Sequence, residues 1–259
     1  MTTTLAELLD LTVTALLTGY IVFLRVGGAM ALLPAFGETM ISVRVRLVLT
    51  VAFTLIILPA VAPVVAPLVD KGTVIGLFVV TEPIIGVALG AFLRLMVLAL
   101  QITGMIAAQS TSLSQIFGGT TAEPQPAVGH ILTMGGLALA VMMGLHVAVA
   151  QVLIGTYDVM PPGQFPAAEA IREWGLSGIV HAFRLAFSLA APFVVGGLIY
   201  NIALGAINRA MPQLMVAFVG APALTFGGLV LLMLALPTAL AIWQGAFQAI
   251  LSDPFRVIP

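Results

Sequence analysis

The chain contains no cysteine and very few charged residues. Only 7% of its 259 residues are charged, whereas 61% are hydrophobic. A soluble globular domain carries about 25% charged residues, so this chain cannot cover a water-facing surface and belongs in or against a membrane. The absence of cysteine excludes disulfides, zinc–cysteine sites and thiol catalysis. A net charge of −1 argues against a nucleic-acid partner.

Motifs for chemistry are also missing from the sequence. It contains no phosphate-binding GxxxxGK(S/T) loop, no HExxH zinc motif and no GxSxG nucleophile motif. The three histidines, His130, His146 and His181, have no i, i+4 spacing and no carboxylate beside them, so no metal site is expected. The sequence therefore predicts neither an enzyme nor a cofactor.

Long apolar stretches fill most of the chain. A helix that crosses a bilayer needs about 20 mostly apolar residues, and no segment alternates with the period of a barrel strand. Several stretches exceed one crossing and contain internal prolines, which kink or break helices. We therefore expect an all-α membrane protein built of kinked helices and helical hairpins. The six stretches cover residues 11–33, 45–69, 73–108, 127–155, 176–208 and 214–251.

Three polar connections, at 34–44, 109–126 and 156–175, separate some of these stretches. None has the composition of a linker between domains, so a single domain over residues 1–259 is expected. Basic residues in short loops normally fix the orientation in the membrane. Here they give a tie, which indicates either a different helix count or a protein not placed by simple insertion rules. One side would hold Lys71, Arg172 and Arg256, and the other Arg44, Arg46 and Arg209.

Four charged residues, Arg25, Glu82, Arg94 and Arg184, lie inside the apolar stretches. A charge at the bilayer centre costs about 2.5 kcal/mol or more, so such residues normally face protein or water. Glu82 and Arg94 would lie about 18 Å apart on one helix, too far to pair, so their partners must come from other helices or chains. The alternatives are an ion or proton path and a set of buried pairs that fix helix register. We favour the second, because one carboxylate with scattered arginines makes a poor relay.

Small residues recur at a spacing of four. Such rows let helix backbones approach closely, although some would arise by chance in a chain with 26 glycines. We expect them to mark helix packing. The pair is Gly86 and Gly90, and the longer row is Gly136, Ala140, Gly144 and Ala148.

Four segments of the sequence together resemble one known family. The first, residues 24–47, has Arg25 in an apolar helix, the turn PAFGE at 34–38, and the basic residues Arg44 and Arg46. EPIIGVALG at 82–90, GMIAAQSTSLSQIFGG at 104–119 and NIALGAINRAMPQLMVAFVGAP at 201–222 follow. In this order and at this length they resemble the FliR/SctT-like family of type III secretion export-gate subunits.

The resemblance implies a place and a set of partners. Members assemble with several copies of the flagellar P and Q subunits into a helical export gate in the basal body at the bacterial inner membrane. They also meet the flagellar B export switch protein, membrane lipid, and the unfolded flagellar subunits that the gate secretes. It further implies that polar residues serve contacts between helices or subunits. These are Arg25, Glu38, Arg44, Arg46, Glu82, Arg94, Arg184, Arg209 and Gln213.

The resemblance also places a plug of the closed pore within residues 110–122. Leu113, Ile116 and Phe117 would supply a soft apolar obstruction, and Gly118 and Gly119 would supply flexibility. An ordinary surface loop with scattered apolar residues is the alternative.

Three rival functions stay open at this point. The same architecture could serve a virulence injectisome in place of a flagellum. A secondary transporter with Glu82 and Arg184 along a substrate path would have broken helices near the midplane, although no two similar halves are visible. An intramembrane enzyme ranks lowest, because no plausible catalytic pair is present.

Overall fold

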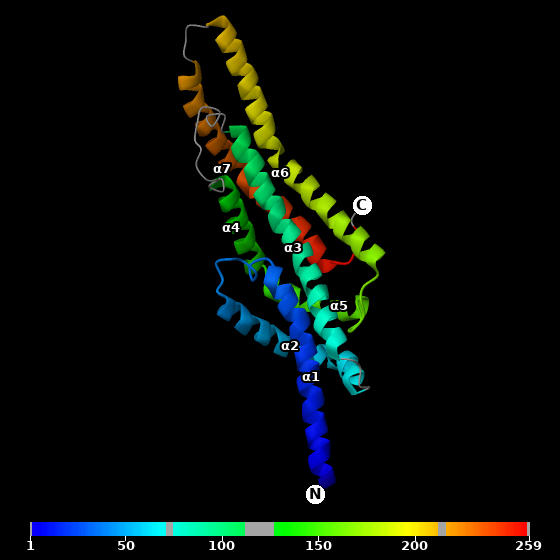
Figure 1. Ribbon diagram of the computed structural model, residues 1–259. Coiled ribbons are helices and arrows are strands. Elements are labelled where there is room, and N and C mark those ends of the chain that lie inside the picture. The colour runs from blue at the N-terminus through cyan, green and yellow to red at the C-terminus, as the bar shows by residue number, and fades with distance from the viewer. Residues whose placement is uncertain (1, 71–74, 112–126, 212–215, 258–259) are drawn as a thin grey trace. The chain divides into compact units, whose positions relative to one another are not determined.

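The computed structural model describes residues 2–70, 75–111, 127–211 and 216–257 (Figure 1). These residues form seven helices and no strand, which confirms the prediction of an all-α protein. The helices are α1 (Thr2–Leu32), α2 (Val43–Asp70), α3 (Ile75–Thr111), α4 (Ala127–Met142), α5 (Leu145–Val159), α6 (Ala168–Ala210) and α7 (Val216–Ser252).

Five helices are long and apolar enough to cross a membrane, and the broken pair α4–α5 makes a sixth candidate. The fourth apolar stretch is therefore interrupted, and the row of small residues from Gly136 to Ala148 does not continue along one helix. The break falls at Gly144, whose φ of 84° lies in the left-handed region that glycine adopts without strain. Gly136 and Ala140 remain buried on α4.

Internal prolines do not divide the long helices. Helix α2 runs through Pro59, Pro63 and Pro67, α3 through Pro83, and α6 through Pro192. A proline removes one backbone hydrogen bond from a helix, and a long helix retains enough of the others to continue past it. Each of these prolines therefore lies within a continuous helix.

The chain forms two compact units. Unit 1 comprises residues 1–95, 141–178 and 249–259, and unit 2 comprises residues 96–140 and 179–248. Four helices, α3, α4, α6 and α7, contribute residues to both units. The expectation of a single domain stays a prediction.

In unit 1, helix α1 packs against α2, α2 contacts α5, and α1 crosses the first half of α3 at glycines. A Cβ atom at Gly86 would lie 2.1 Å from the carbonyl oxygen of Arg25, and one at Gly90 would lie 2.6 Å from that of Ala29. A Cβ at Gly28, on the α1 side, would lie 2.5 Å from the carbonyl oxygen of Pro83. Since only glycine permits such backbone contact, these positions set the distance between α1 and α3.

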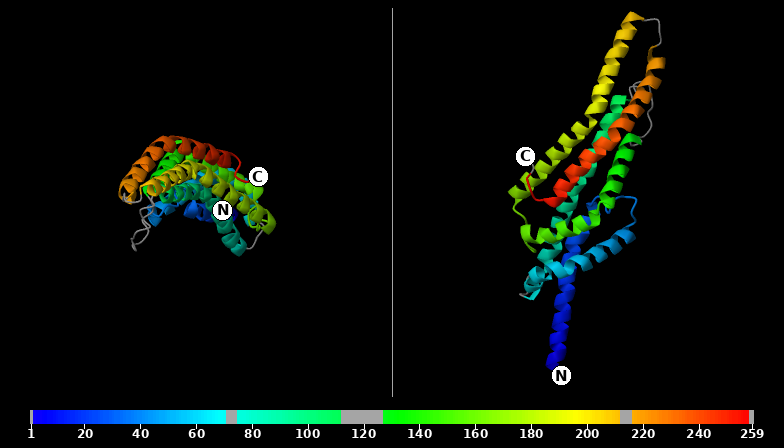
Figure 2. Two further views of the ribbon diagram at one scale, coloured as in Figure 1. Left: turned by 90° about the horizontal axis from the view of Figure 1, so that it is seen from above. Right: turned by 180° about the vertical axis from the view of Figure 1, so that it is seen from behind.

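In unit 2, the second half of α3 meets α4 just as closely. A Cβ atom at Gly104 would lie 2.1 Å from the Cα of Gly129. Helices α6 and α7 lie side by side in both views of Figure 2, and Phe193 and Leu232 from these helices pack with Ala107 of α3. These contacts form an apolar core within unit 2.

Candidate functional site

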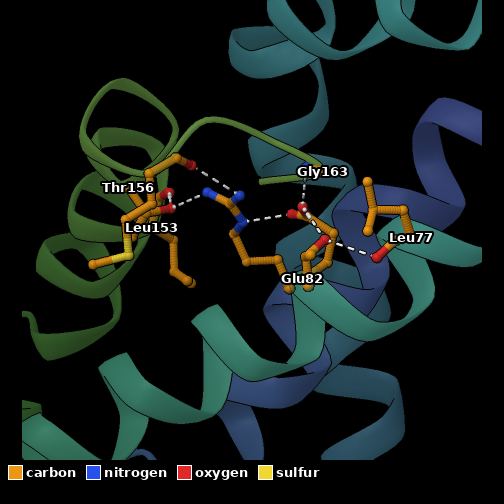
Figure 3. Close-up of polar contacts among 8 residues, drawn as sticks. Leu77, Glu82, Leu153, Thr156 and Gly163 are labelled. Atoms are coloured by element: carbon orange, nitrogen blue, oxygen red, sulfur yellow. Dashed lines mark hydrogen bonds and ion pairs between the residues drawn. The ribbon is translucent and has the colours of Figure 1, made fainter. Parts of the chain in front are cut away.

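The most buried polar feature of the described residues is an ion pair in unit 1. Arg25 Nε, on α1, donates to Glu82 Oε2, on α3, over 2.7 Å, and both side chains are 0% exposed (Figure 3). The glycine crossing explains why they meet. Gly86 lies one turn after Glu82, and its missing side chain lets the backbone of Arg25 come within reach.

The rest of the Arg25 guanidinium is held by α5 and by the residue that ends it. Nη1 donates to the Thr156 hydroxyl over 3.0 Å, and Nη2 donates to the Met160 carbonyl over 3.1 Å. The guanidinium carbon lies 3.9 Å from the ring centroid of Tyr157, which is cation–π geometry. Since an arginine has a planar fork of donors, one side chain can tie α1 to both α3 and α5.

The second oxygen of Glu82 reaches the connection between α5 and α6. The backbone N–H of Gly163 donates to Glu82 Oε1 over 2.9 Å, and the Thr81 hydroxyl lies 3.4 Å from the same oxygen. Gly163 has a φ of 74°, and a Cβ there would lie 2.8 Å from a ring carbon of Phe78. Both its conformation and its surroundings therefore require glycine.

Chemically, this cluster is a clamp in which each charge is satisfied. It gathers α1, α3, α5 and the α5–α6 connection around one arginine and one carboxylate. Two charges in a dry interior are tolerated when they are paired and their remaining donors and acceptors are hydrogen-bonded, as they are here. With both Glu82 oxygens occupied, the geometry favours a structural pair over a step in a proton path.

A second polar group holds the turn between α1 and α2. Arg94 Nη1 lies 3.5 Å from Glu38 Oε1, and Arg46 Nη2 donates to the Glu38 carbonyl over 3.0 Å. The Glu38 and Arg94 side chains are partly exposed, and Arg44 is exposed. The contacts that hold this turn are therefore weaker and more exposed than the contact between Arg25 and Glu82.

The other predicted residues are not gathered in one place. Arg184 and Arg209 are exposed residues of unit 2. Outside the described residues lie Gln213 and the five plug candidates, Leu113, Ile116, Phe117, Gly118 and Gly119. In the described ranges, no three His, Asp or Glu side chains come together in a way that could hold a metal ion.

Sequence reasoning missed the α5 side of the clamp. Thr156, Tyr157, Met160 and Gly163 lie at the start of the polar connection 156–175, for which we expected a turn and a short polar helix but no contact with a buried charge. The Pro-Pro-Gly turn that ends in Gly163 was the available signal, but a turn does not reveal which charge its N–H meets.

Trp174 was also missed. Its ring stacks on Phe92 with centroids 4.1 Å apart, and its Nε1–H donates to the Pro254 carbonyl over 2.7 Å. This contact fastens the residues after α7 onto unit 1. Trp243, in unit 2, makes a similar bond to the Met96 carbonyl over 2.7 Å.

Comparison with known proteins identifies the family. The model of bacterial export proteins, family 1, matches residues 16–250. A flagellar biosynthetic protein FliR from Caulobacter vibrioides is 30% identical over 233 residues, which cover 89% of this chain and 93% of that protein. Proteins of the same name are 27% identical in Aquifex aeolicus, over 93% and 92% of the two chains, and 26% identical in Escherichia coli, over 91% and 92%. The chain belongs to family 1 of the bacterial export proteins.

Proposed function

We propose that this chain, as a subunit of the flagellar type III protein export gate in the inner membrane, forms part of the pore wall through which unfolded flagellar subunits are secreted. The single observation that carries this function is the family match over residues 16–250. The relatives named for flagellar biosynthesis, similar over most of both chains, favour the flagellar gate over the virulence injectisome. The basal body of the flagellum is its location.

Partners are part of the proposal. The resemblance indicates several copies of the flagellar P and Q subunits, the flagellar B export switch protein and the secreted subunits as neighbours. The burial of the helices supports an assembly, because an 18-residue apolar window of the α7 span Phe226–Ser252 is only 17% buried within this chain. Other subunits or lipid must cover such a surface in the cell.

Within this gate the chain acts as a structural subunit and not as an enzyme. The Arg25–Glu82 clamp supports this role, because its groups bind one another and fix how α1, α3 and α5 fit together. We propose the same kind of role, contacts between helices or subunits, for Glu38, Arg46 and Arg94, and at exposed positions for Arg44, Arg184 and Arg209.

The plug remains a proposal from sequence and resemblance alone, since Leu113, Ile116, Phe117, Gly118 and Gly119 lie outside the described residues. A deletion of residues 112–119 should raise ion leakage across the membrane when the assembled gate is present. Unchanged conductance of that variant would remove the plug from the proposal.

The test of the gate proposal is the purification of a tagged chain from its own host in mild detergent, with mass spectrometry of the particle and of its chains. A large particle with two small multicopy membrane proteins is expected. A reproducible monomer or plain homo-oligomer would contradict the proposed assembly. Components of a needle complex among the chains would indicate the injectisome.

A further inference from the structure

Helix α2 carries three prolines on one exposed face. Pro59, Pro63 and Pro67 follow at a spacing of four and are all exposed. We call these residues the proline stripe. Two positions round the helix from each proline, Ile57, Val61 and Val65 are 0%, 2% and 0% exposed. Since two residues correspond to about 200° of helix rotation, the proline stripe faces away from the core of unit 1.

The proline stripe changes the backbone as well as the surface. A proline has no N–H, so the carbonyl four residues before it loses its regular helical donor. The carbonyls affected are those of Leu55, Pro59 and Pro63, which share the spacing of four and therefore follow the same exposed face. Three partial negative charges thus line up along a surface that is otherwise formed by aliphatic side chains.

The two threonines of α2 do not supply the missing donors. The hydroxyl groups of α2 that could do so bond elsewhere, Thr50 to the Arg46 carbonyl over 2.8 Å and Thr54 to the Thr50 carbonyl over 2.7 Å. Lipid tails offer no hydrogen bond, and an unsatisfied backbone group in hydrocarbon is costly. Prolines are tolerated in membrane helices where neighbouring helices or ordered water satisfy the freed carbonyls.

We propose that the proline stripe of α2 binds an apolar helix of another subunit of the gate. Side chains of that helix donate N–H or O–H groups to the carbonyls of Leu55, Pro59 and Pro63. The charge complementarity specifies the partner, because a row of carbonyl dipoles selects Ser, Thr, Asn, Gln or Trp side chains on an otherwise apolar helix. Ala52 and Ala60, both exposed on this face, are small enough to let such a helix approach the α2 backbone.

A neighbouring subunit fits this face better than water does. Leu55 and Ile56 are each 64% exposed beside the prolines, and no polar side chain lies on α2 between Leu55 and Val69. If water covered this face, these large apolar side chains would stay exposed to solvent. A helix that buries them can also donate hydrogen bonds to the freed carbonyls. The proposal rests on the proposed gate function in that the partner belongs to the same complex.

Spin labels on this face provide the first test. Because the chain has no cysteine, Ile56→Cys and Val64→Cys each give one labelling site, and both leave the proline stripe and the small residues Ala52 and Ala60 intact. Collision with O2 reports lipid, and collision with a water-soluble nickel chelate reports water. In the complex from host membranes, we expect loss of both relative to the same labelled chain reconstituted alone in lipid. High O2 accessibility in the complex, or high nickel accessibility, would overturn the proposal.

The same sample separates this inference from the gate proposal. Mass spectrometry of the complex identifies the gate partners and decides the proposed function, whereas the label reading alone decides whether a protein covers the proline stripe. A complete gate with an O2-accessible label would support the proposed function and contradict the proposed contact at the proline stripe.

A backbone variant provides the second test. The triple substitution Pro59→Ala, Pro63→Ala and Pro67→Ala restores the helical donors and therefore withdraws the three acceptors from the partner, while it favours the helix itself. We expect roughly a tenfold loss of partner association, from three weak interhelical bonds. Pro192→Ala, at an isolated exposed proline of α6, is the matched control and should retain its partners. Full association of the triple variant would contradict the proposal.

Discussion

The two units of this protein hold their helices together by different means. In unit 1, a buried ion pair joins α1 to α3 and reaches α5 and the connection after it through further hydrogen bonds. In unit 2, the buried hydroxyl groups among the described residues are those of Thr103 and Thr133. Its helices meet through glycines, apolar side chains and uncharged hydrogen bonds such as that from Trp243 to the Met96 carbonyl. Both buried charges therefore belong to unit 1.

The difference shows that buried charge specifies how the helices of unit 1 fit together, whereas the size of the side chains between the helices specifies it in unit 2. Apolar surfaces can pack in several arrangements of similar energy, so unit 2 depends on how closely its backbones approach. A buried arginine tolerates few arrangements, because every alternative leaves a charge without its partner. Both units should therefore be sensitive to added volume at their close helix crossings, and unit 1 should in addition be sensitive to the loss of a polar atom.

The largest loss of stability is expected when one residue of the Arg25–Glu82 ion pair is replaced. Arg25→Leu leaves the Glu82 carboxylate buried without its cation, which should destabilise the protein by about 3–5 kcal/mol. The midpoint of thermal unfolding in detergent and the yield of assembled complex measure this loss, and motility measures its consequence. Wild-type assembly and motility of Arg25→Leu would contradict the clamp.

The double variant Arg25→Leu with Glu82→Leu sharpens that result. Removal of both charges takes away the uncompensated carboxylate, so much of the lost stability should return. A double variant as unstable as Arg25→Leu would show that the clamp acts through its hydrogen bonds to α5 rather than through charge. Arg256→Leu, at an exposed arginine beyond the end of α7, is the matched control for loss of a positive charge.

The sequence was sufficient for the all-helical fold and for the burial of Arg25 and Glu82. Hydropathy located the spans, because each needs about 20 apolar residues, and the cost of charge in lipid indicated that both residues face protein. It could not pair them. They are 57 residues apart in the chain, and a spacing of that length contains no information about which helices cross.

Glycine spacing was informative in one place and misleading in another. Gly86 and Gly90 lie where α3 contacts the α1 backbone, whereas Gly144 breaks the helix that its spacing would have continued. A small residue permits both close packing and a left-handed turn, so the spacing of four cannot distinguish them. The clamp residue Gly163 was hidden for a related reason, since its partner lies on a distant helix.

The next effect in size comes from added volume at the close helix crossings. Gly86→Ala in unit 1 and Gly104→Ala in unit 2 would each place a Cβ 2.1 Å from backbone, which forces the helices apart and should cost about 1–3 kcal/mol. Thermal unfolding in detergent measures both. Gly155→Ala, with nothing within 4 Å of its Cβ, is the control and should be neutral or slightly stabilising. Equal effects at all three positions would refute the crossing argument.

A smaller effect is expected at the two tryptophans, and it should differ between the units. Trp174→Phe removes the bond to the Pro254 carbonyl, which lies beyond α7, and should cost about 1–2 kcal/mol. Trp243→Phe removes a bond to the Met96 carbonyl, which lies inside α3 and keeps its helical donor, so about 0.5–1 kcal/mol is expected. Both substitutions remove the same volume, so unfolding midpoints in the reverse order would contradict this account.

The smallest effect is expected at the turn between α1 and α2. Arg94 Nη1 and Glu38 Oε1 lie 3.5 Å apart, too far for a strong hydrogen bond, and the two side chains are partly exposed, so the pair is weak. Arg94→Ala should therefore cost less than about 1 kcal/mol in the same thermal assay, although Arg94 and Arg25 are both arginines within apolar stretches. A loss comparable to that of Arg25→Leu would mean that water does not reach this turn in the assembled gate, and that a partner buries it.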